Sequence, residues 1–455
     1  MKARKHLHSR SLDLWLRKPA PRYTSYPPAP FFHNGVSNED YIESLKKLPK
    51  EQPVALYVHI PFCKSLCLYC GCNTIITNRP DRIGNYLIAL RREIEIIATI
   101  IGHRHIESLH FGGGTPNILS DPDMRSLFEC LRTNFDFCAT REIAMEIDPR
   151  ITSPDQAHLL ANCGVTRVSI GVQDFDPAVQ VFIRRVQPYK IVAEACNWLR
   201  AADIAHINFD LIYGLPQQTL KSIADTARLA CTLTPDRIAL FSYAHVPQLK
   251  RHQAALESAG IPDMPQRLAL DQIARGIFTG HGYKSIGIDH FAKDGDSVLE
   301  AWRAGKLHRN FQGYTQDGAT PLIGLGASSI SQTSDGYFQN ERDTRAYQEC
   351  ISNGHLSVHR GFLLSREDGV RAAIIERLMC NLSCDIKEIC LAYDFPPEHF
   401  LPELKALKPL ERDGIIAREG YALCLTTPYR MAIRVVCSFF DDYTHQAQVS
   451  ASRTA

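Results

Sequence analysis

The chain lacks the long apolar segment that a membrane protein needs. It contains no run of about eighteen apolar residues, whereas a helix that crosses a bilayer uses about twenty. Its first ten residues are basic, but no apolar stretch of the kind found in secretory signals follows them. We therefore expect no membrane partner, no export and a cytoplasmic location.

An excess of one charge is also missing. The 51 lysines and arginines nearly balance the 49 aspartates and glutamates, which gives a net charge of +2. Proteins that bind nucleic acid through its phosphates usually carry a clear basic excess. The composition therefore gives no reason to expect a nucleic-acid partner.

Cysteine, by contrast, is plentiful, with fifteen in the chain. So many cysteines would suit a disulfide framework in a secreted protein, but cytosolic thiols stay reduced and are available for metal. Three of them, Cys63, Cys67 and Cys70, follow an apolar, strand-like run and stand at C-x3-C-x2-C spacing. We take this stretch, residues 57–74, as the centre of the candidate site.

The three cysteines suggest an iron–sulfur cluster. Thiolate is the usual ligand of such clusters, and a 4Fe–4S cube commonly takes four, so three thiolates leave one iron open to bind another molecule. A structural zinc site is the alternative, but it needs four closing ligands and commonly uses paired C-x2-C units. Cys72 is available as a fourth ligand, yet no second pair follows. Three buried structural thiols are a further alternative.

Short apolar runs alternate with helical patterns from residue 51 to residue 291. This alternation predicts repeated βα units and a parallel sheet. Six units are too few for a closed eight-stranded barrel, so we predict an α/β fold, an open partial (β/α)6 barrel with its site at the C-terminal strand ends. The predicted strands are Val54–His59, Ser108–Phe111, Glu142–Ile147, Thr166–Val172, Ile207–Ile212 and Arg237–Tyr243.

A glycine-rich motif ends the second predicted strand. Gly112, Gly113 and Gly114 precede Thr115 and Pro116. Glycines let the backbone approach a ligand closely, because no Cβ intervenes. An ordinary βα turn needs one glycine, so three followed by Thr-Pro favour a ligand-binding loop.

Carboxylates stand on the third and fifth predicted strands. Glu146 and Asp148 end the third, where they can accept hydrogen bonds from the amine or hydroxyls of a ligand. A salt bridge or a helix cap is the alternative for both. Asp210 lies in the middle of the fifth strand between apolar neighbours, where a charge is costly unless paired, so we predict a functional role for it.

An arginine follows the fourth strand. Gln173 ends this strand, and Arg185 lies twelve residues beyond it. A guanidinium group suits a carboxylate of a ligand. The adjacent Arg184 is the alternative for the residue that faces inward. Ala244 stands just after the sixth strand.

The remaining segments predict three smaller parts. Residues 1–50 carry five prolines between Pro19 and Pro30 and predict an extended N-terminal arm over another domain. Residues 292–364 are glycine-rich and polar between apolar stretches and predict an extension that wraps the barrel. Residues 365–455 predict a small, mostly helical, winged-helix-like C-terminal domain, for which the balanced charge argues against DNA binding.

Three further cysteines lie in this C-terminal part. Cys380, Cys384 and Cys390 show C-x3-C-x5-C spacing on predicted helix. No fourth ligand follows them, and free cysteines are often buried like small apolar residues. We therefore predict buried thiols here rather than a second cluster.

Taken together, the motifs resemble those of the oxygen-independent coproporphyrinogen III oxidases, which belong to the radical S-adenosylmethionine (SAM) superfamily. The resemblance runs almost end to end. It rests on PRYTSYP, YVHIPFC with the three cysteines and the following Gly-Cys-Asn, HFGGGTP, EIDPR, GVQDF, NFDLIYGLP and HRNFQGYT. Tyr69 departs mildly, since the family often has phenylalanine there, but the ring is kept.

The resemblance implies the cofactors and their residues. Cys63, Cys67 and Cys70 are implied to hold a 4Fe–4S cluster, with one SAM on the open iron and a second SAM beside it. Residues implied to line the first SAM are Tyr57, Glu146 and Ile330. Residues implied to line the second are Gly113, Gly114, Thr115, Gln173, Arg185, Asp210 and Ala244. Tyr69 is a further cofactor-binding candidate, and the predicted catalytic residues are Tyr57, Glu146 and Cys72, of which Cys72 matches a non-ligand cysteine of the family.

The implied reaction is the oxidative decarboxylation of two propionates of coproporphyrinogen III to vinyl groups, which gives protoporphyrinogen IX in haem biosynthesis. In this family the cluster donates an electron to SAM, and the resulting radical takes a hydrogen atom from the propionate. The electron donor and acceptor are unidentified, and the resemblance suggests a monomer. We hypothesise that the arm at residues 22–26 and the loop at residues 309–314 close over the macrocycle.

Two related functions remain as alternatives. Haem-carrying chaperones keep the three cysteines but deliver haem without decarboxylation; they lack the PRYTSYP arm and usually Cys72, both present here. A radical SAM methyltransferase that acts on haem is the second alternative.

Overall fold

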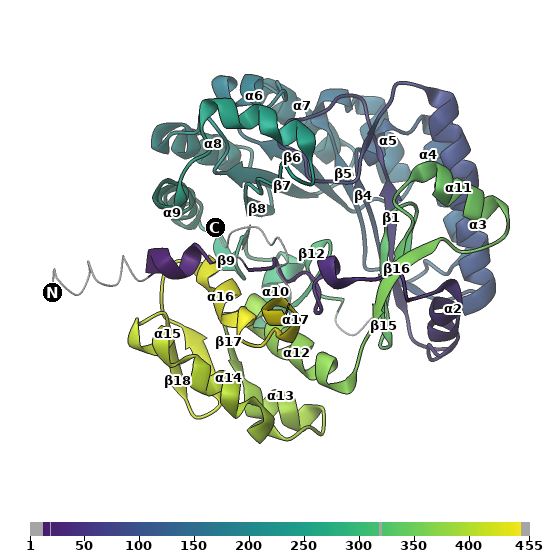
Figure 1. Ribbon diagram of the computed structural model, residues 1–455. Coiled ribbons are helices and arrows are strands. Elements are labelled where there is room, and N and C mark those ends of the chain that lie inside the picture. The colour runs from purple at the N-terminus through teal and green to yellow at the C-terminus, as the bar shows by residue number, and fades with distance from the viewer. Residues whose placement is uncertain (1–11, 19, 318–320, 447–455) are drawn as a thin grey trace.

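The computed structural model describes residues 12–18, 20–317 and 321–446. The basic first ten residues and Pro19, noted in the sequence, lie outside these ranges. The main feature is a twelve-stranded sheet in the order β16-β15-β14-β13-β1-β4-β5-β6-β7-β8-β10-β9. Its strands form an open, curved wall with helices on the outside (Figure 1).

The six predicted strands are all present and run parallel to their neighbours, which confirms the open partial barrel. In β1 six of the seven residues are buried, as expected for a strand covered on both faces. Since the strands are parallel, their C-terminal ends lie at one edge. Their bounds are β1 Val54–Ile60, β4 Ile106–Gly113, β5 Glu142–Ile147, β6 Arg167–Gln173, β7 His206–Tyr213 and β8 Arg237–Ser242.

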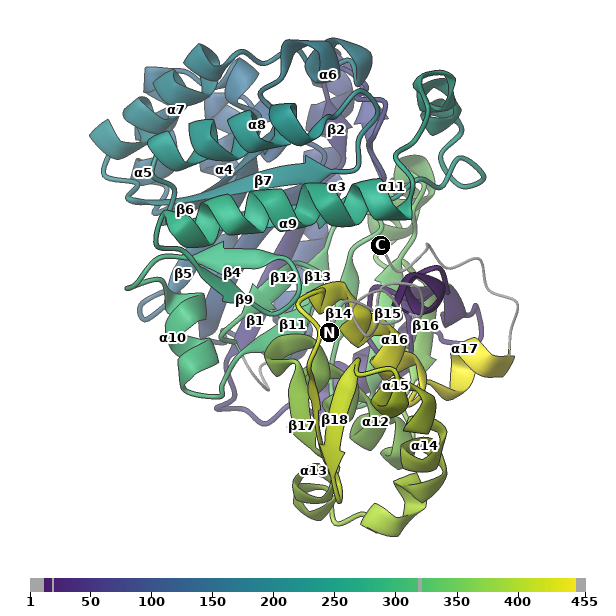
Figure 2. The same ribbon diagram turned by 90° about the vertical axis from the view of Figure 1, so that its left-hand side faces the viewer.

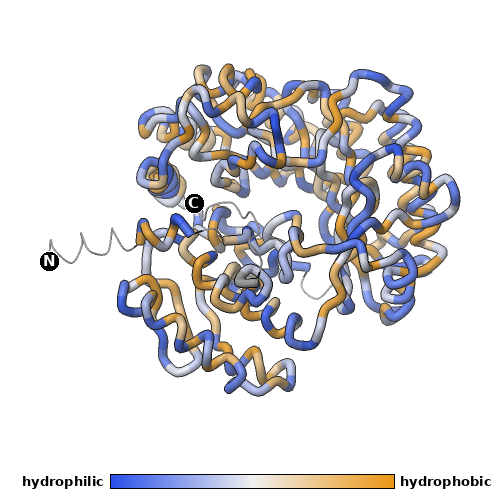
Figure 3. Tube along the Cα trace, viewed as in Figure 1, coloured by the Kyte–Doolittle hydropathy of each residue, from blue (hydrophilic) through white to orange (hydrophobic). Residues whose placement is uncertain are grey.

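Amphipathic helices cover the outer face of these strands (Figures 1 and 2). Hydropathy alternates along them, because one face packs on the sheet and the other meets water (Figure 3). The hydroxyls of Ser120, Ser153 and Thr219 cap three of them and fix where they begin. The bounds are α3 Pro80–Ile101, α4 Asp121–Asn134, α5 Pro154–Asn162, α6 Pro177–Phe182, α7 Tyr189–Ala201, α8 Leu220–Thr232 and α9 Met264–Gly280, with 3-10 turns at η2 Pro116–Ile118, η3 Pro149–Ile151 and η4 Arg251–Ala259.

The parallel part has a further strand that the sequence analysis did not predict. β13 (Leu322–Leu325) runs parallel to β1, with Ala55 opposite Leu322. It is short and lies in a glycine-rich stretch, so its pattern is weak. The extension thus adds strands to the sheet. Its other elements and the opposite edge are β9 Lys284–Ile286, β10 His290–Ala292, α10 Ser297–Arg303, β11 His308–Asn310, β12 Gly313–Thr315, β14 Ile330–Gln332, β15 Gly336–Asn340, α11 Thr344–Ser352 and β16 Val358–Leu363.

The C-terminal part packs helices around a small three-stranded sheet in the order β17-β19-β18. The two strands read from the sequence on either side of Gly420 are β18 and β19, which pair antiparallel. The bounds are α12 Arg366–Asn381, β17 Ser383–Asp385, α13 Ile386–Ala392, η5 Pro397–Phe400, α14 Leu401–Ala406, α15 Lys408–Arg412, β18 Ile416–Glu419, β19 Ala422–Leu425, η6 Arg430–Ala432, α16 Ile433–Ser438 and α17 Asp442–Gln446.

The N-terminal arm passes between the open side of the barrel and the C-terminal helices (Figure 1). The Tyr23 hydroxyl donates a hydrogen bond to Asp441 at 3.0 Å, and Arg22 Nη2 donates to the carbonyl of Ser242, at the end of β8, at 3.0 Å. The arm therefore contacts both parts. Its regular elements are η1 Ala29–Phe31 and α2 Asn38–Lys46.

Among the described residues, no helix combines the length and apolar content required to cross a membrane.

Candidate active site

The cysteine loop begins at the C-terminal end of β1. Two short parallel strands, β2 (Phe62–Cys63) and β3 (Ile75–Ile76), close its base. Three side chains that follow β8 hold its backbone. Lys250 Nζ lies 2.6 Å from the carbonyl oxygen of Cys72, His252 Nε2 lies 2.8 Å from that of Cys70, and Gln253 Nε2 lies 2.9 Å from that of Tyr69. These contacts connect the cysteine loop after β1 to the segment that follows β8.

The spacing of the three thiols separates the two metal hypotheses. One zinc ion with sulfur ligands at about 2.3 Å would draw its sulfurs to within about 4 Å of one another. Among the described residues, Cys63, Cys67 and Cys70 do not bring all three sulfurs within 4.8 Å of one another. The donor set is all thiol and is wider than one ion requires. It therefore fits an iron–sulfur cluster better than a single zinc ion.

The glycine loop lies directly against the cysteine loop. Gly113 has φ +112°, and a Cβ there would lie 2.5 Å from the His59 ring; a Cβ on Gly114 would lie 2.6 Å from the carbonyl oxygen of Phe62. Neither position can carry a larger residue without displacement. The Thr115 hydroxyl donates a hydrogen bond to Cys63 Sγ at 3.2 Å.

Glu146 is half-buried beside this loop and stays ionised. Its Oε2 accepts a hydrogen bond from the Gly113 N–H at 3.2 Å, and its Oε1 lies 3.5 Å from His110 Nε2. Burial opposes the charge, but His110 and the Gly113 N–H outweigh it and lower the pKa of Glu146. A carboxylate is thus available to a cationic or hydroxyl group in the cavity.

Tyr57 and His59 form a second polar pair on β1. His59 Nε2 lies 3.1 Å from the carbonyl oxygen of Asn73, so this nitrogen carries the proton, and Nδ1 accepts from the Tyr57 hydroxyl at 3.0 Å. Burial lowers the pKa of His59, which is therefore neutral. The Tyr57 ring stacks on His110 with centroids 5.9 Å apart.

Asp210 carries a second carboxylate into the same space. Ser169 donates to one of its oxygens at 2.8 Å and Asn208 to the other at 3.0 Å. Burial and the nearby charge of Glu146 raise the pKa of Asp210 to about 6. The mid-strand carboxylate therefore has polar partners in the protein, and its functional role stays a prediction.

Arg185, and not Arg184, faces inward. Its Nη2 donates to the carbonyl of Gly171 at 2.7 Å, and its Nη1 lies 3.5 Å from Asp148 Oδ2 and 3.7 Å from Cys67 Sγ. Arg184 is exposed. Asp148 also caps the 3-10 turn that follows it and pairs with Arg150, so it has the structural role that we weighed for it.

These side chains line one cavity of about 440 Å³ at the C-terminal strand ends. A smaller cavity of about 170 Å³ inside the barrel shares Glu146, Asp210 and Phe241 with it. Of the predicted site residues, the larger cavity is lined by Cys63, Cys67, Tyr69, Cys70, Cys72, Gly113, Gly114, Thr115, Glu146, Gln173, Arg185 and Asp210. Tyr57, Ala244 and Ile330 do not line it, although Tyr57 stacks on His110, the partner of Glu146.

Comparison with known proteins shows which family has this sequence and fold. The profile described as the Radical SAM superfamily matches residues 57–230. Over 434 residues the chain is 42% identical to a Bradyrhizobium diazoefficiens protein named "Oxygen-independent coproporphyrinogen III oxidase", with 95% of this chain and 96% of that protein covered. The chain belongs to the oxygen-independent coproporphyrinogen III oxidase family. The Escherichia coli protein of the same name is 39% identical over 94% of this chain and 93% of its own length.

The structure agrees with membership of this oxidase family. A solved structure entitled "Coproporphyrinogen III oxidase (HemN) from Escherichia coli is a Radical SAM enzyme" matches with a TM-score of 0.89 and 38% identity, covering 93% of this chain and 97% of that one. Membership of the radical SAM oxidases implies a 4Fe–4S cluster and SAM as cofactors. It favours the oxidase over the haem-binding and methyltransferase alternatives.

Several residues that shape the oxidase site were missed in the sequence. His59 and His110 have a recognisable signal, because each is a polar residue at alternate positions of an apolar strand: Tyr57 and His59 share one face of β1, and Ser108 and His110 share one face of β4. No sequence signal marks Lys250, His252 and Gln253, because they contact a loop about 180 residues earlier in the chain.

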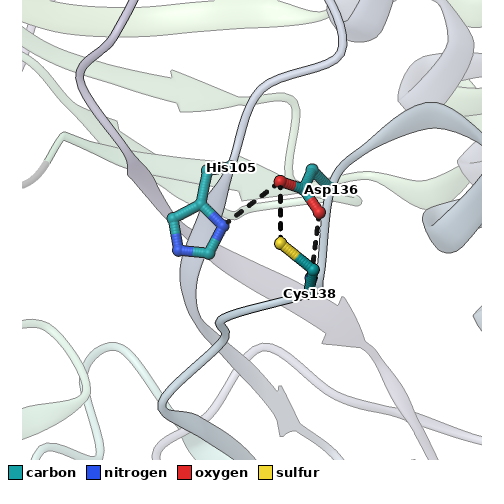
Figure 4. Close-up of side chains that lie close together, drawn as sticks. All are labelled: His105, Asp136 and Cys138. Atoms are coloured by element: carbon teal, nitrogen blue, oxygen red, sulfur yellow. Dashed lines mark hydrogen bonds and ion pairs between the residues drawn. The ribbon is translucent and has the colours of Figure 1, made fainter.

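Another group of ligand-type side chains lies away from the oxidase cavity. His105, Asp136 and Cys138 bring three such atoms within 4.8 Å of one another (Figure 4). Asp136 already accepts hydrogen bonds from the Cys138 N–H at 2.9 Å and its thiol at 3.3 Å. His105 precedes β4, whose opposite end carries Gly113. The group is therefore separated from the cavity by the length of that strand.

The cysteines of the C-terminal part are buried. Cys380, Cys384 and Cys390 are at most 8% exposed. Their burial agrees with the prediction of buried thiols at these positions.

Proposed function

We propose that the protein catalyses the oxidative decarboxylation of two propionates of coproporphyrinogen III to vinyl groups, giving protoporphyrinogen IX. The observation that carries the proposal is the extent of the match to the oxidase relatives, which takes in 95% of the chain. A radical SAM barrel alone serves many reactions, since a fold does not fix a function. The arm, the barrel and the C-terminal elements match together.

In this proposal Cys63, Cys67 and Cys70, which line the cavity, would hold the 4Fe–4S cluster and leave one iron free to bind SAM. When bound, the cluster and SAM supply the radical that takes a hydrogen atom from the propionate β-carbon. Each propionate then loses CO2 and one further electron to an acceptor that is still to be identified. The chain's own contribution is to bind, to orient and to exclude water.

The predicted roles of the lining residues extend this proposal. Glu146 is held ionised and can accept hydrogen bonds from the amine or hydroxyls of one SAM, with Tyr57 and Ile330 beside it. The residues proposed for a second SAM are Gly113, Gly114, Thr115, Gln173, Arg185, Asp210 and Ala244. Of these, Arg185 offers a cation for a carboxylate and Asp210 an acceptor for hydroxyls. Tyr69 is proposed to contact a cofactor, and Cys72, on the cavity wall, remains a proposed catalytic residue.

We also propose that the protein acts as a cytoplasmic monomer on this small-molecule substrate, with no nucleic-acid or membrane partner and with an electron donor and acceptor to be identified. The division into an arm (1–50), a barrel (51–291), an extension (292–364) and a C-terminal domain (365–455) is part of the proposal.

The test is anaerobic reconstitution with iron and sulfide, followed by SAM, a reductant and coproporphyrinogen III. We expect deoxyadenosine and CO2 to form together, and a Cys67→Ala variant to make neither. Stable uptake of haem with no protoporphyrinogen from coproporphyrinogen would instead favour the haem-binding alternative.

A further inference from the structure

Three arginines from distant segments meet at the open side of the barrel. Arg22 lies on the arm, Arg309 on β11 and Arg434 on α16. Arg434 Nε donates to the carbonyl of Pro21 at 2.9 Å and so holds the backbone immediately before Arg22. Arg22 in turn donates to the carbonyl of Ser242. The arm thus brings the Arg22 guanidinium to the end of β8, while Arg434 holds the backbone before it.

The three charges act on one another. Burial, and then the charge of Arg22, lower the pKa of Arg434 to about 9, and Arg309 contributes. The pKa of Arg22 is also lowered, by burial and by Arg309, although its side chain is open to solvent.

Arg309 has hydrogen-bonding capacity that the described protein does not use. Its side chain is 7% exposed, and its Nε and Nη1 have no hydrogen-bond partner among the described residues. The carboxylate closest to it is Asp289, 3.8 Å from Nη2, and Asp289 is already bonded to His290 at 2.7 Å. A buried donor without a partner is unfavourable, so these two N–H groups suit an acceptor that the described residues do not supply.

In the part of the chain that the structure describes, Asp289 is a carboxylate that acts on both Arg22 and Arg309. Asp289 lies between His290 and Arg309, with Arg275 close to it. Asp441 accepts hydrogen bonds from the hydroxyls of Tyr23 and Thr444. A partly buried excess of positive charge is unfavourable unless an anion joins it. An anion is therefore the kind of acceptor that suits this place.

The position of the arginines connects them to the active cavity. Ser242, the partner of Arg22, follows Phe241, which lines both cavities of the site. Arg309 precedes Asn310, which lines the cavity inside the barrel, and itself lines a further cavity of about 450 Å³ together with residues 23–26 of the arm. An anion here would lie beside the reaction space.

We propose that Arg22, Arg309 and Arg434 form a receptor for carboxylates that holds propionate side chains of the tetrapyrrole while others react. The inference rests on the proposed function, because that substrate carries four propionates and keeps two of them as carboxylates. A guanidinium group matches a carboxylate with two parallel N–H donors. The receptor orients the macrocycle and gives the arm its part in substrate binding.

The test measures binding of coproporphyrin III, the stable tetracarboxylate, to the anaerobically reconstituted holoenzyme. We expect Arg22→Gln and Arg309→Gln each to weaken binding about 10- to 100-fold, as for loss of a charged hydrogen-bond pair, and Arg309→Lys to weaken it less. Iron content and SAM affinity stay unchanged. The control is Arg228→Gln, which removes an exposed arginine of α8 and should change nothing.

The tetramethyl ester of coproporphyrin III is the second probe. It has no carboxylates, so we expect the variants to bind it as the unsubstituted protein does. An equal loss for acid and ester, or a parallel loss of SAM affinity, would overturn the receptor. So would unchanged binding and KM in Arg22→Gln and Arg309→Gln in an enzyme that turns over coproporphyrinogen III. If the unsubstituted holoenzyme neither binds nor converts the tetrapyrrole, the proposed function itself fails. If Arg309→Gln fails to hold its cluster, the test is decided by Arg22→Gln, because Arg22 is exposed and its substitution should leave the fold intact.

Discussion

Thr115 Oγ1 donates a hydrogen bond to Cys63 Sγ at 3.2 Å, which joins the glycine loop to the loop of the cluster thiols. A donor to a cluster sulfur withdraws negative charge and raises the reduction potential. We expect Thr115→Val to lower the potential of the reconstituted cluster by about 40 mV, because one hydrogen bond is worth about 1 kcal/mol and 59 mV corresponds to a tenfold change. Redox titration followed by electron paramagnetic resonance measures it.

Thr115→Ser keeps the hydroxyl and is the matched control, with a potential close to that of the unsubstituted protein. Equal potentials for the valine and serine variants would show that the hydrogen bond does not affect the cluster.

Gly114→Ala should disrupt the glycine loop. Its Cβ would lie 2.6 Å from the carbonyl oxygen of Phe62, which is backbone and cannot rotate away. We expect a loss of about 1–3 kcal/mol in stability and weaker SAM binding, measured by urea unfolding and calorimetry. Gly84→Ala is the control, since its Cβ meets nothing within 4 Å in the middle of α3, and it should stabilise the protein slightly. Equal stabilities for both variants would refute the close approach.

Asp210 should make SAM binding depend on pH. Burial first and then Glu146 raise the pKa of Asp210 to about 6, so its carboxylate is ionised at pH 7.5 and mostly protonated at pH 5. We expect SAM affinity to fall by up to about tenfold over this range, since roughly a tenth of the carboxylate remains ionised one unit below the pKa. Calorimetric titration of the holoenzyme at several pH values measures this, and Asp210→Asn should flatten the profile. A variant profile that keeps its full slope would assign the dependence to another group.

Asp296 should stabilise the barrel at the N-terminal ends of β6 and β8, where Arg167 and Arg237 lie. It lies between Arg237, at 2.8 Å, and Arg167, at 3.3 Å, and it caps α10. Burial opposes its charge, but Arg237 and Arg167 outweigh burial and lower the pKa of Asp296. Its stabilisation is therefore present above the unfolded pKa and is lost as the pH falls through the folded pKa. We expect Asp296→Ala to cost about 3–5 kcal/mol at neutral pH, because the buried Arg237 loses its counter-ion and the buried Arg167 keeps only Glu142.

Urea unfolding measures this loss, and Asp294→Ala supplies the comparison. Asp294 is mostly exposed and pairs with Arg303 on the surface, so its removal should change stability by less than about 1 kcal/mol. If the two variants unfolded at the same urea concentration, the buried ion pairs of Asp296 would contribute no more to stability than the surface pair of Asp294.

Much of this site could be predicted from the sequence because its residues stand at strand ends. The runs that became β1, β4, β5, β6, β7 and β8 are apolar and bounded by glycine, proline or polar residues, so their C-terminal ends were readable. Parallel pairing then brings Glu146 and Asp210, which are 64 positions apart in number, to the wall of one cavity.

What could not be predicted depends on contacts between distant segments. Arg434 lies on a short helix whose sequence gives no hint that it reaches the arm at Pro21. β13 has four residues, and only its pairing with β1 makes it a strand. Ile330 and Ala244 were carried over from a resemblance, and they do not line the main cavity among the described residues.

The most direct test of the account concerns the open iron. The anaerobically reconstituted protein, enriched in 57Fe, is measured by Mössbauer spectroscopy with and without SAM. We predict about four iron atoms per chain in a 4Fe–4S cluster, one of which changes its spectrum when SAM binds while the other three, held by Cys63, Cys67 and Cys70, do not. A protein that takes up no cluster, or a cluster in which no iron site responds to SAM, would contradict the account.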